Sequence, residues 1–253
     1  MWTPVVVPFQ NSQPLPTLPT TDEIRACTNV LWETMASKVV ALNDDIVEGQ
    51  ALVYLERHVP EVPAPRLYAM YHDSEQLFLI MQRNPRVQLD SIWPSLAPSE
   101  KDDIIAKLQR IFDAIQHGDG KSLGPFSGEP AFVAGLVGNY RALTTRLAFT
   151  KKYLARVLQG HRPTLTHGGV QQKNIMVVEN TSRPNDQGGR SFDVVLVDWE
   201  NSGWFPDFWE FFCASYPMIF QWDEDWSWRV QEFVEVWPAE MAMMQLIDKE
   251  LGW

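Results

Sequence analysis

The sequence predicts an α+β protein with a small strand-rich N-terminal part and a larger helical C-terminal part. The first observation is a pair of β-rich runs, RLYAMYH (66–72) and QLFLIMQ (76–82), which three turn-forming residues separate and which predict a hairpin. The second is a helical repeat of apolar residues after Ser99, formed by Ile104, Leu108, Ile111, Phe112 and Ile115. We place the boundary between the two parts after residue 84, so that they span 1–84 and 85–253.

Short local signals predict the other elements of the N-terminal part. Thr20 and Glu23 form a capping box, which predicts a helix that runs to about Met35. The apolar run 39–42 predicts a strand. The run 48–58 is apolar along one side and predicts a helix that stops before the prolines that follow it.

The C-terminal part is predicted to carry a second hairpin among its helices. NIMVVEN (174–180) and FDVVLVDW (192–199) are its predicted strands, and the segment TSRPNDQGGRS between them is predicted to be flexible. Helices are predicted over about 145–158 and through 207–253. In the latter segment, tryptophan and methionine side chains are expected to form core and groove wall.

Composition favours a small-molecule or protein partner in the cytoplasm. The chain has 32 acidic and 21 basic residues, a net charge of −11 that disfavours nucleic acid because such binding needs clustered Lys and Arg. Its two cysteines, Cys27 and Cys213, are too few for a disulfide framework, and the N-terminus lacks the features of a signal peptide. No stretch approaches the roughly 18 apolar residues of a membrane span, so no membrane partner is expected.

Two motifs point to a family. HGGVQQKNI (167–175) is followed by VVLVDWENSGW (194–204). From about residue 18 to residue 222 the chain resembles the aminoglycoside phosphotransferase and choline kinase group of protein-kinase-like enzymes. The matching positions are His167, Gly168, Asn174, Val197, Asp198, Trp199 and Glu200, and SGWFPDFWEF continues the likeness. The resemblance implies a two-lobed kinase-like fold with a reduced strand-rich N-lobe (1–84) and a helical C-lobe (85–253) that carries both motifs.

The resemblance also assigns chemical roles. Phosphoryl transfer needs Mg²⁺ held by oxygen ligands, here Asn174 and Asp198, and a carboxylate that takes the proton of the attacking hydroxyl. The resemblance places that carboxylate at position 169, where this chain has Gly169. Loss of a positioned base costs about 10²- to 10⁴-fold in rate, so this change alone predicts a poor kinase.

Nucleotide binding is predicted to be impaired as well. The family's phosphate-binding lysine lies on a strand and is held by a helix glutamate, for which Glu48 is the candidate. Aligning KVVAL with that strand puts Ala41 at the lysine position; alternatively, the lysine-bearing part of the strand is deleted. Lys38 lies three residues before Ala41 and therefore on the opposite face of a strand. No glycine precedes Gly49, so a glycine-rich phosphate loop is not found.

Three functions remain open. The preferred one is a repurposed enzyme that performs non-phosphorylating acid/base chemistry, such as isomerisation, cyclisation or elimination, on a hydrophobic or aromatic metabolite, without a cofactor. The others are a residual phosphotransferase that uses Mg²⁺ and ATP, and a non-catalytic binding protein.

The predicted catalytic residues are His167, Asp198 and Glu200; a structural role for His167, tying the two loops together, is the alternative. The predicted ligand contacts are Gly169, Gln171, Lys173, Trp199, Trp204, Phe205 and Trp222. Asn174 and Asp198 would hold a metal only if that site survives, and the oligomeric state is not predicted.

Overall fold

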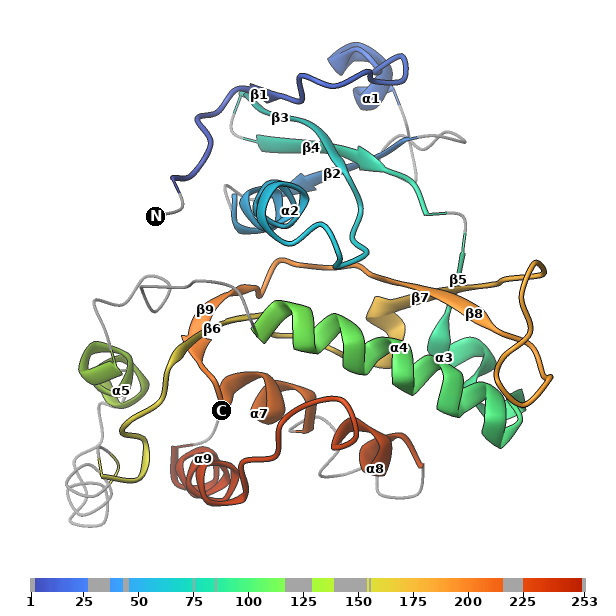
Figure 1. Ribbon diagram of the computed structural model, residues 1–253. Helices are drawn as coiled ribbons and strands as arrows, with labels where there is room; N and C mark the ends of the chain where they lie inside the picture. Colours follow the sequence, from blue (N-terminus) through green and yellow to red (C-terminus); the bar gives the residue numbers. More distant parts are fainter. Residues whose placement is uncertain are drawn as a thin grey trace. The chain divides into compact units, whose positions relative to one another are not determined.

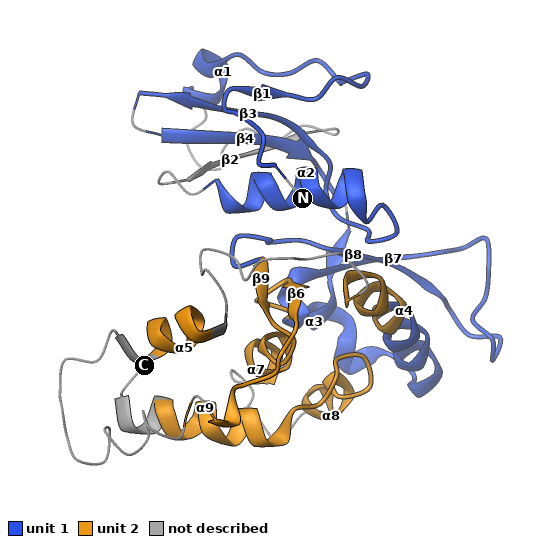
Figure 2. Cartoon of the chain, turned by 60° about the vertical axis from the view of Figure 1, so that its left-hand side comes forward, with its two compact units in different colours: residues 1–107, 171–202 blue, residues 108–170, 203–253 orange. Residues whose placement is uncertain are grey.

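A computed structural model of the chain is shown in Figure 1. It describes residues 3–26, 37–42, 46–74, 76–84, 86–116, 129–138, 154, 156–215 and 225–251. The chain forms two compact units: residues 1–107 with 171–202, and residues 108–170 with 203–253 (Figure 2). Strands and helices occur together, as the α+β prediction requires. The predicted boundary after residue 84 stays a prediction.

The first unit contains a four-stranded antiparallel sheet in the order β1-β3-β4-β2. Its elements are β1 (Phe9–Gln10), α1 (Thr21–Arg25), β2 (Ser37–Leu42), α2 (Val47–His58), β3 (Leu67–Asp73) and β4 (Gln76–Gln82). The predicted hairpin is therefore confirmed as β3 and β4. Ser74 in its turn has a φ of 58°, the left-handed conformation that tight turns require.

The two faces of this sheet are covered by different segments (Figures 1 and 2). Helix α2 covers one face so closely that a Cβ atom on Gly49 would lie 2.5 Å from Sδ of Met70. On the other face, Ile24 of α1 packs with Ala69, Phe78 and Ile80. Burial of apolar side chains on both faces explains why β4 reads as a continuous apolar run rather than an alternating one.

The N-terminal segment is fastened to the sheet at several points. β1 pairs with β3, and Val5 exchanges two 2.8 Å hydrogen bonds with the side chain of Gln50 on α2. The side-chain amide of Asn11 donates to the carbonyl of Leu67 and to Glu56. At the start of α1 the predicted capping box is present. The described helix ends at Arg25, and residues 27–35 of the predicted helix lie outside the described part.

A second sheet in this unit, in the order β5-β7-β8, carries one of the motifs. Its strands and neighbours are β5 (Val87–Gln88), α3 (Leu89–Ile92), the 3-10 helix η1 (Trp93–Ser95), η2 (Gln172–Asn174), β7 (Ile175–Glu179) and β8 (Phe192–Leu196). The predicted second hairpin is confirmed as β7 and β8, which pair in antiparallel register.

The connection between β7 and β8 is ordered, which corrects the prediction of a flexible segment. It docks on the first half of α4 (Pro98–Gln116). Asn185 is buried; its side-chain oxygen accepts from the backbone of Gln187 and Gly189, and its amide donates to the carbonyl of Ser99. Arg190 forms two hydrogen bonds, of 2.7 and 3.1 Å, with the carboxylate of Glu100. These contacts reach about 90 residues along the chain, so local composition did not indicate them.

The second unit is mainly helical, with one short pair of strands. It contains the second half of α4, and also α5 (Glu129–Gly138), β6 (Pro163–Thr166), β9 (Gly203–Pro206), α7 (Trp209–Ser215), α8 (Trp226–Val230) and α9 (Pro238–Leu251). Its core cluster consists of Phe132, Val133, Leu136, Leu154, Leu158, Phe208, Met244 and Ile247, with Trp237 and Met243 packed at its edge. Met244, Met243 and Trp237 thus contribute to the core as predicted, whereas Trp228 is 62% exposed and does not. Within the described ranges, no helix is long and apolar enough to cross a membrane.

Candidate functional site

In the first unit, the β7–β8 hairpin holds the two predicted metal ligands at one end. Ile175 pairs with Leu196, and one step beyond this pair the Val197 amide donates to the Asn174 carbonyl at 3.0 Å. Asn174 therefore lies beside the residue that precedes Asp198. Mg²⁺ bound by only one or two protein side chains takes its other ligands from water and phosphate. This pair fits such an ion only in company with a phosphate group; elsewhere in the described residues no cluster of three or more His, Cys, Asp or Glu could hold a metal.

Asp198 adopts a backbone conformation that is uncommon for its residue type. Its φ is 70°, in the left-handed region that aspartate and asparagine tolerate better than most residues. The next residues fix this turn: the fully buried indole of Trp199 donates to the carbonyl of Leu196 at 3.1 Å, and the Ser202 hydroxyl donates to the carbonyl of Trp199 at 2.6 Å. Backbone strain of this kind persists only where the surroundings enforce it, and it is common at functional sites.

The other predicted residues of this unit differ in exposure. Asp198 and Gln171 are half-buried, whereas Glu200 and Lys173 are exposed. The backbone carbonyl of Lys173 accepts a 3.0 Å hydrogen bond from the side chain of Gln88. Asp198 and Glu200 are thus the predicted acid/base residues that solvent reaches, while the indole of Trp199 supports the loop from inside.

In the second unit, the HGG motif follows β6. β6 pairs with β9, and the Thr166 hydroxyl donates to the carbonyl of Gly203 at 3.1 Å. His167 is completely buried. Gly168 has a φ of 74°, which glycine adopts without the strain that a side chain would bring. Gly169 is half-buried at the end of this turn.

Glu210 on α7 supports the HGG turn and was not predicted. Its Oε2 atom accepts hydrogen bonds from the backbone amides of His167 and Gly168, the latter at 3.3 Å. Its Oε1 atom has no hydrogen-bond partner among the described residues. Burial raises the pKa of Glu210 to about 7, although the two amides act in the opposite direction. The available signal was an acidic residue inside the apolar run FWEFF.

Cys213 lies one turn after Glu210 on the same helix and carries a free thiol. Burial, and secondly the nearby charge of Glu210, raise the pKa of this thiol. A thiol that stays protonated is a weak nucleophile, so Cys213 is not a catalytic candidate. Cys27 lies outside the described residues.

The predicted aromatic ligand contacts are only partly described. Trp204 pairs with Leu165 in the β6–β9 ladder and is half-buried. Phe205 stacks on Trp209 with ring centroids 5.5 Å apart, at the edge of the core cluster. Trp222 lies outside the described residues.

Strand β2, which holds the position expected for the nucleotide lysine, pairs with β4 in antiparallel register. Lys38 pairs with Met81 and Ala41 pairs with Phe78. The alignment that puts Ala41 at the lysine position stays a prediction.

Comparison with known proteins gives a likeness in structure alone. No protein-family model matches the sequence, and no curated protein matches it. Among solved structures, an aminoglycoside 3'-phosphotransferase of type VIII is similar with a TM-score of 0.53 and 16% identity, over 84% of this chain and 83% of the other.

The aminoglycoside phosphotransferase APH(3'')-Id of Streptomyces rimosus is similar with a TM-score of 0.53 and 16% identity, over 86% of each chain. Its complex with ADP and streptomycin gives a TM-score of 0.52 and 17% identity, over 86% of this chain and 87% of that one. Structural likeness at such low sequence identity shows the fold alone, so function must be argued from the residues of the site. The chain therefore has the protein-kinase-like α+β fold of the aminoglycoside phosphotransferases.

Proposed function

We propose that this protein is a small-molecule enzyme that retains the fold of aminoglycoside phosphotransferases and performs non-phosphorylating acid/base chemistry on a hydrophobic or aromatic metabolite in the cytoplasm. The observation that carries the proposal is Gly169, at the position where phosphoryl transfer requires a carboxylate. Isomerisation, cyclisation and elimination are the reaction classes that need only proton transfer at a bound substrate.

The carboxylate of Glu210, which contacts the HGG turn, already has a structural role. Glu210 is buried, and its Oε2 atom accepts from the amides of His167 and Gly168. A general base must come within hydrogen-bond reach of the substrate proton. Glu210 therefore positions the turn and does not replace the missing base.

The sequence before α2 supports a loss of ordinary nucleotide binding. A kinase covers its phosphates with a glycine-rich loop, and the chain has no glycine before Gly49.

The remaining groups suit proton transfer. Asp198 and Glu200 are carboxylates that solvent reaches, and Asp198 is fixed by its strained turn. His167 is buried, so we assign it the structural role of holding the loop. Asp198 is then the residue that transfers the proton in the proposed reaction, and Glu200 is a second carboxylate within the same motif.

A residual ATP-dependent phosphotransferase is the second candidate. The 3.0 Å hydrogen bond from the Val197 amide to the Asn174 carbonyl favours it, because it holds Asn174 beside the residue that precedes Asp198. Asn174 and Asp198 would then hold Mg²⁺ together with the phosphates. Neither role replaces the carboxylate absent at position 169.

We expect Mg-ATP to bind weakly, with a Kd above about 100 μM, which corresponds to roughly 5.5 kcal/mol of binding free energy. Titration calorimetry with millimolar Mg-ATP measures this for the wild type and for Lys38→Ala. Saturable binding below 100 μM that Lys38→Ala abolishes would replace the proposal by the phosphotransferase. Weak binding that the variant leaves unchanged supports the proposal.

A further inference from the structure

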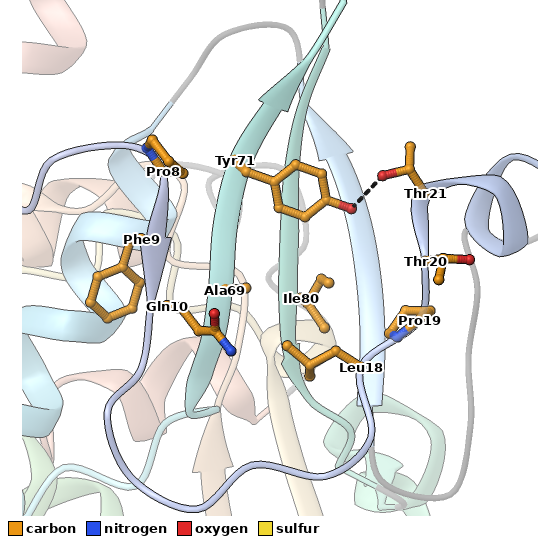
Figure 3. Close-up of a pocket in the computed structure, with 10 residues that line it drawn as sticks. All are labelled: Pro8, Phe9, Gln10, Leu18, Pro19, Thr20, Thr21, Ala69, Tyr71 and Ile80. Atoms are coloured by element: carbon orange, nitrogen blue, oxygen red, sulfur yellow. Dashed lines mark hydrogen bonds between the residues drawn. The ribbon is translucent and has the colours of Figure 1, made fainter.

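The N-terminal segment borders an open pocket on the sheet of the first unit, within the part of the chain that the structure describes. The pocket has a volume of about 460 Å³, which lies within the range of about 300–1,000 Å³ typical of small-molecule sites. It opens on the face away from α2. Figure 3 shows β1 along one side of the pocket and the segment 18–21 along the other, with β3 and β4 behind.

The floor of the pocket is apolar and firmly packed. Ala69 and Ile80 form it and belong to the buried cluster that includes Ile24 of α1. Pro8 and Leu18 line the two sides (Figure 3). The small side chain of Ala69 on the floor and the rigid ring of Pro8 on one side lower the ordering cost of binding.

One edge of the pocket is polar. The ring of Tyr71 reaches from β3 toward Thr21, and the two hydroxyls lie 3.3 Å apart (Figure 3). Each hydroxyl has one donor and two acceptor sites, so this single contact leaves capacity for a ligand. Gln10 adds an amide on the side formed by β1. Among the described residues, no Asp, Glu, Lys, Arg or His lines the pocket.

We propose that this pocket binds a small uncharged ring compound that carries one hydroxyl or carbonyl group. The ring would lie on Ala69 and Ile80, and its polar group would hydrogen-bond with Tyr71 and Thr21. A charged ligand is disfavoured because desolvation of its charge would go uncompensated here. Because β1 and the segment 18–21 flank the ligand, binding would fasten the N-terminal segment to the sheet and stabilise the first unit.

The test uses p-cresol as the neutral probe and 4-methylbenzoate as its charged counterpart. NMR titration of the wild type is expected to show saturable binding of p-cresol, with contacts to the Ile80 methyl groups and the Tyr71 ring. Tyr71→Phe and Thr21→Val are each expected to weaken binding about 2- to 12-fold, the equivalent of one hydrogen bond. Ala69→Leu fills the floor and is expected to abolish binding. Thr17→Val is the matched control, because Thr17 is exposed on the same segment and does not line the pocket.

Three results would overturn the proposal. They are no saturable p-cresol binding below about 10 mM, equal affinity for 4-methylbenzoate, and equal weakening by Thr17→Val and the two hydroxyl variants. If Ala69→Leu does not fold, the contacts seen in the wild type decide alone: p-cresol placed away from Ile80 and Tyr71 contradicts the proposal.

Discussion

Glu210→Gln is expected to stabilise the protein at pH 8 by up to roughly 3 kcal/mol and to flatten its stability between pH 5 and 8. Burial raises the pKa of this carboxyl from 4.5 to about 7. Each tenfold change in proton affinity corresponds to about 1.4 kcal/mol. Glutamine keeps an oxygen that accepts from the amides of His167 and Gly168 and cannot ionise.

The direction of the pH dependence follows from the raised pKa. The folded protein binds the Glu210 proton more tightly than the unfolded chain does, so this contribution to stability is fully present below about pH 4.5. It is lost as the pH rises through about 7. The wild type should therefore lose stability across this window, and the glutamine variant should not.

Urea unfolding at pH 5, 6, 7 and 8 measures the effect. Glu210→Ala is expected to be destabilised at every pH, because the two amides lose their acceptor and each buried unsatisfied group costs about 1–3 kcal/mol. Glu235→Gln is the control, since Glu235 is exposed in the same unit. An identical pH slope for Glu210→Gln and the wild type would show that Glu210 does not ionise in this range.

Asp198→Asn is expected to lower turnover of the natural substrate by about 10²- to 10⁴-fold, the usual effect of removing a positioned general base or acid. Asparagine tolerates the left-handed backbone of this position about as well as aspartate does. The substitution therefore removes the titratable group and leaves the turn intact.

Mass spectrometry of cell metabolite extracts incubated with each protein measures this turnover across many candidate substrates at once. The wild type should convert at least one metabolite that Asp198→Asn leaves intact. Asp186→Asn, in the exposed connection between β7 and β8, is the control and should match the wild type. Equal conversion by wild type and Asp198→Asn would remove Asp198 from catalysis.

Local signals predicted several elements of this fold correctly. The capping box at Thr20, the hairpin turn at Ser74 and the apolar repeat of α4 all act within a few residues, where sequence spacing determines structure. The motif spacing likewise identified the hairpin that carries Asn174 and Asp198.

Contacts between distant segments left no such signal. β1 pairs with β3 about 60 residues further along the chain. Glu210 reaches the amide of His167 over a separation of 43 residues, and Arg190 reaches Glu100 over 90.

The most direct test of the proposed loss of phosphoryl transfer is acceptor-dependent ADP formation from Mg-ATP by the wild type and by Gly169→Asp, with streptomycin and kanamycin as hydroxylated acceptors. Aspartate restores a carboxylate at position 169, yet transfer also requires a phosphate cradle and a covering loop. We predict that neither protein forms ADP above the rate without acceptor. ADP formation that either acceptor stimulates in the wild type would contradict the proposed function and establish a working phosphotransferase.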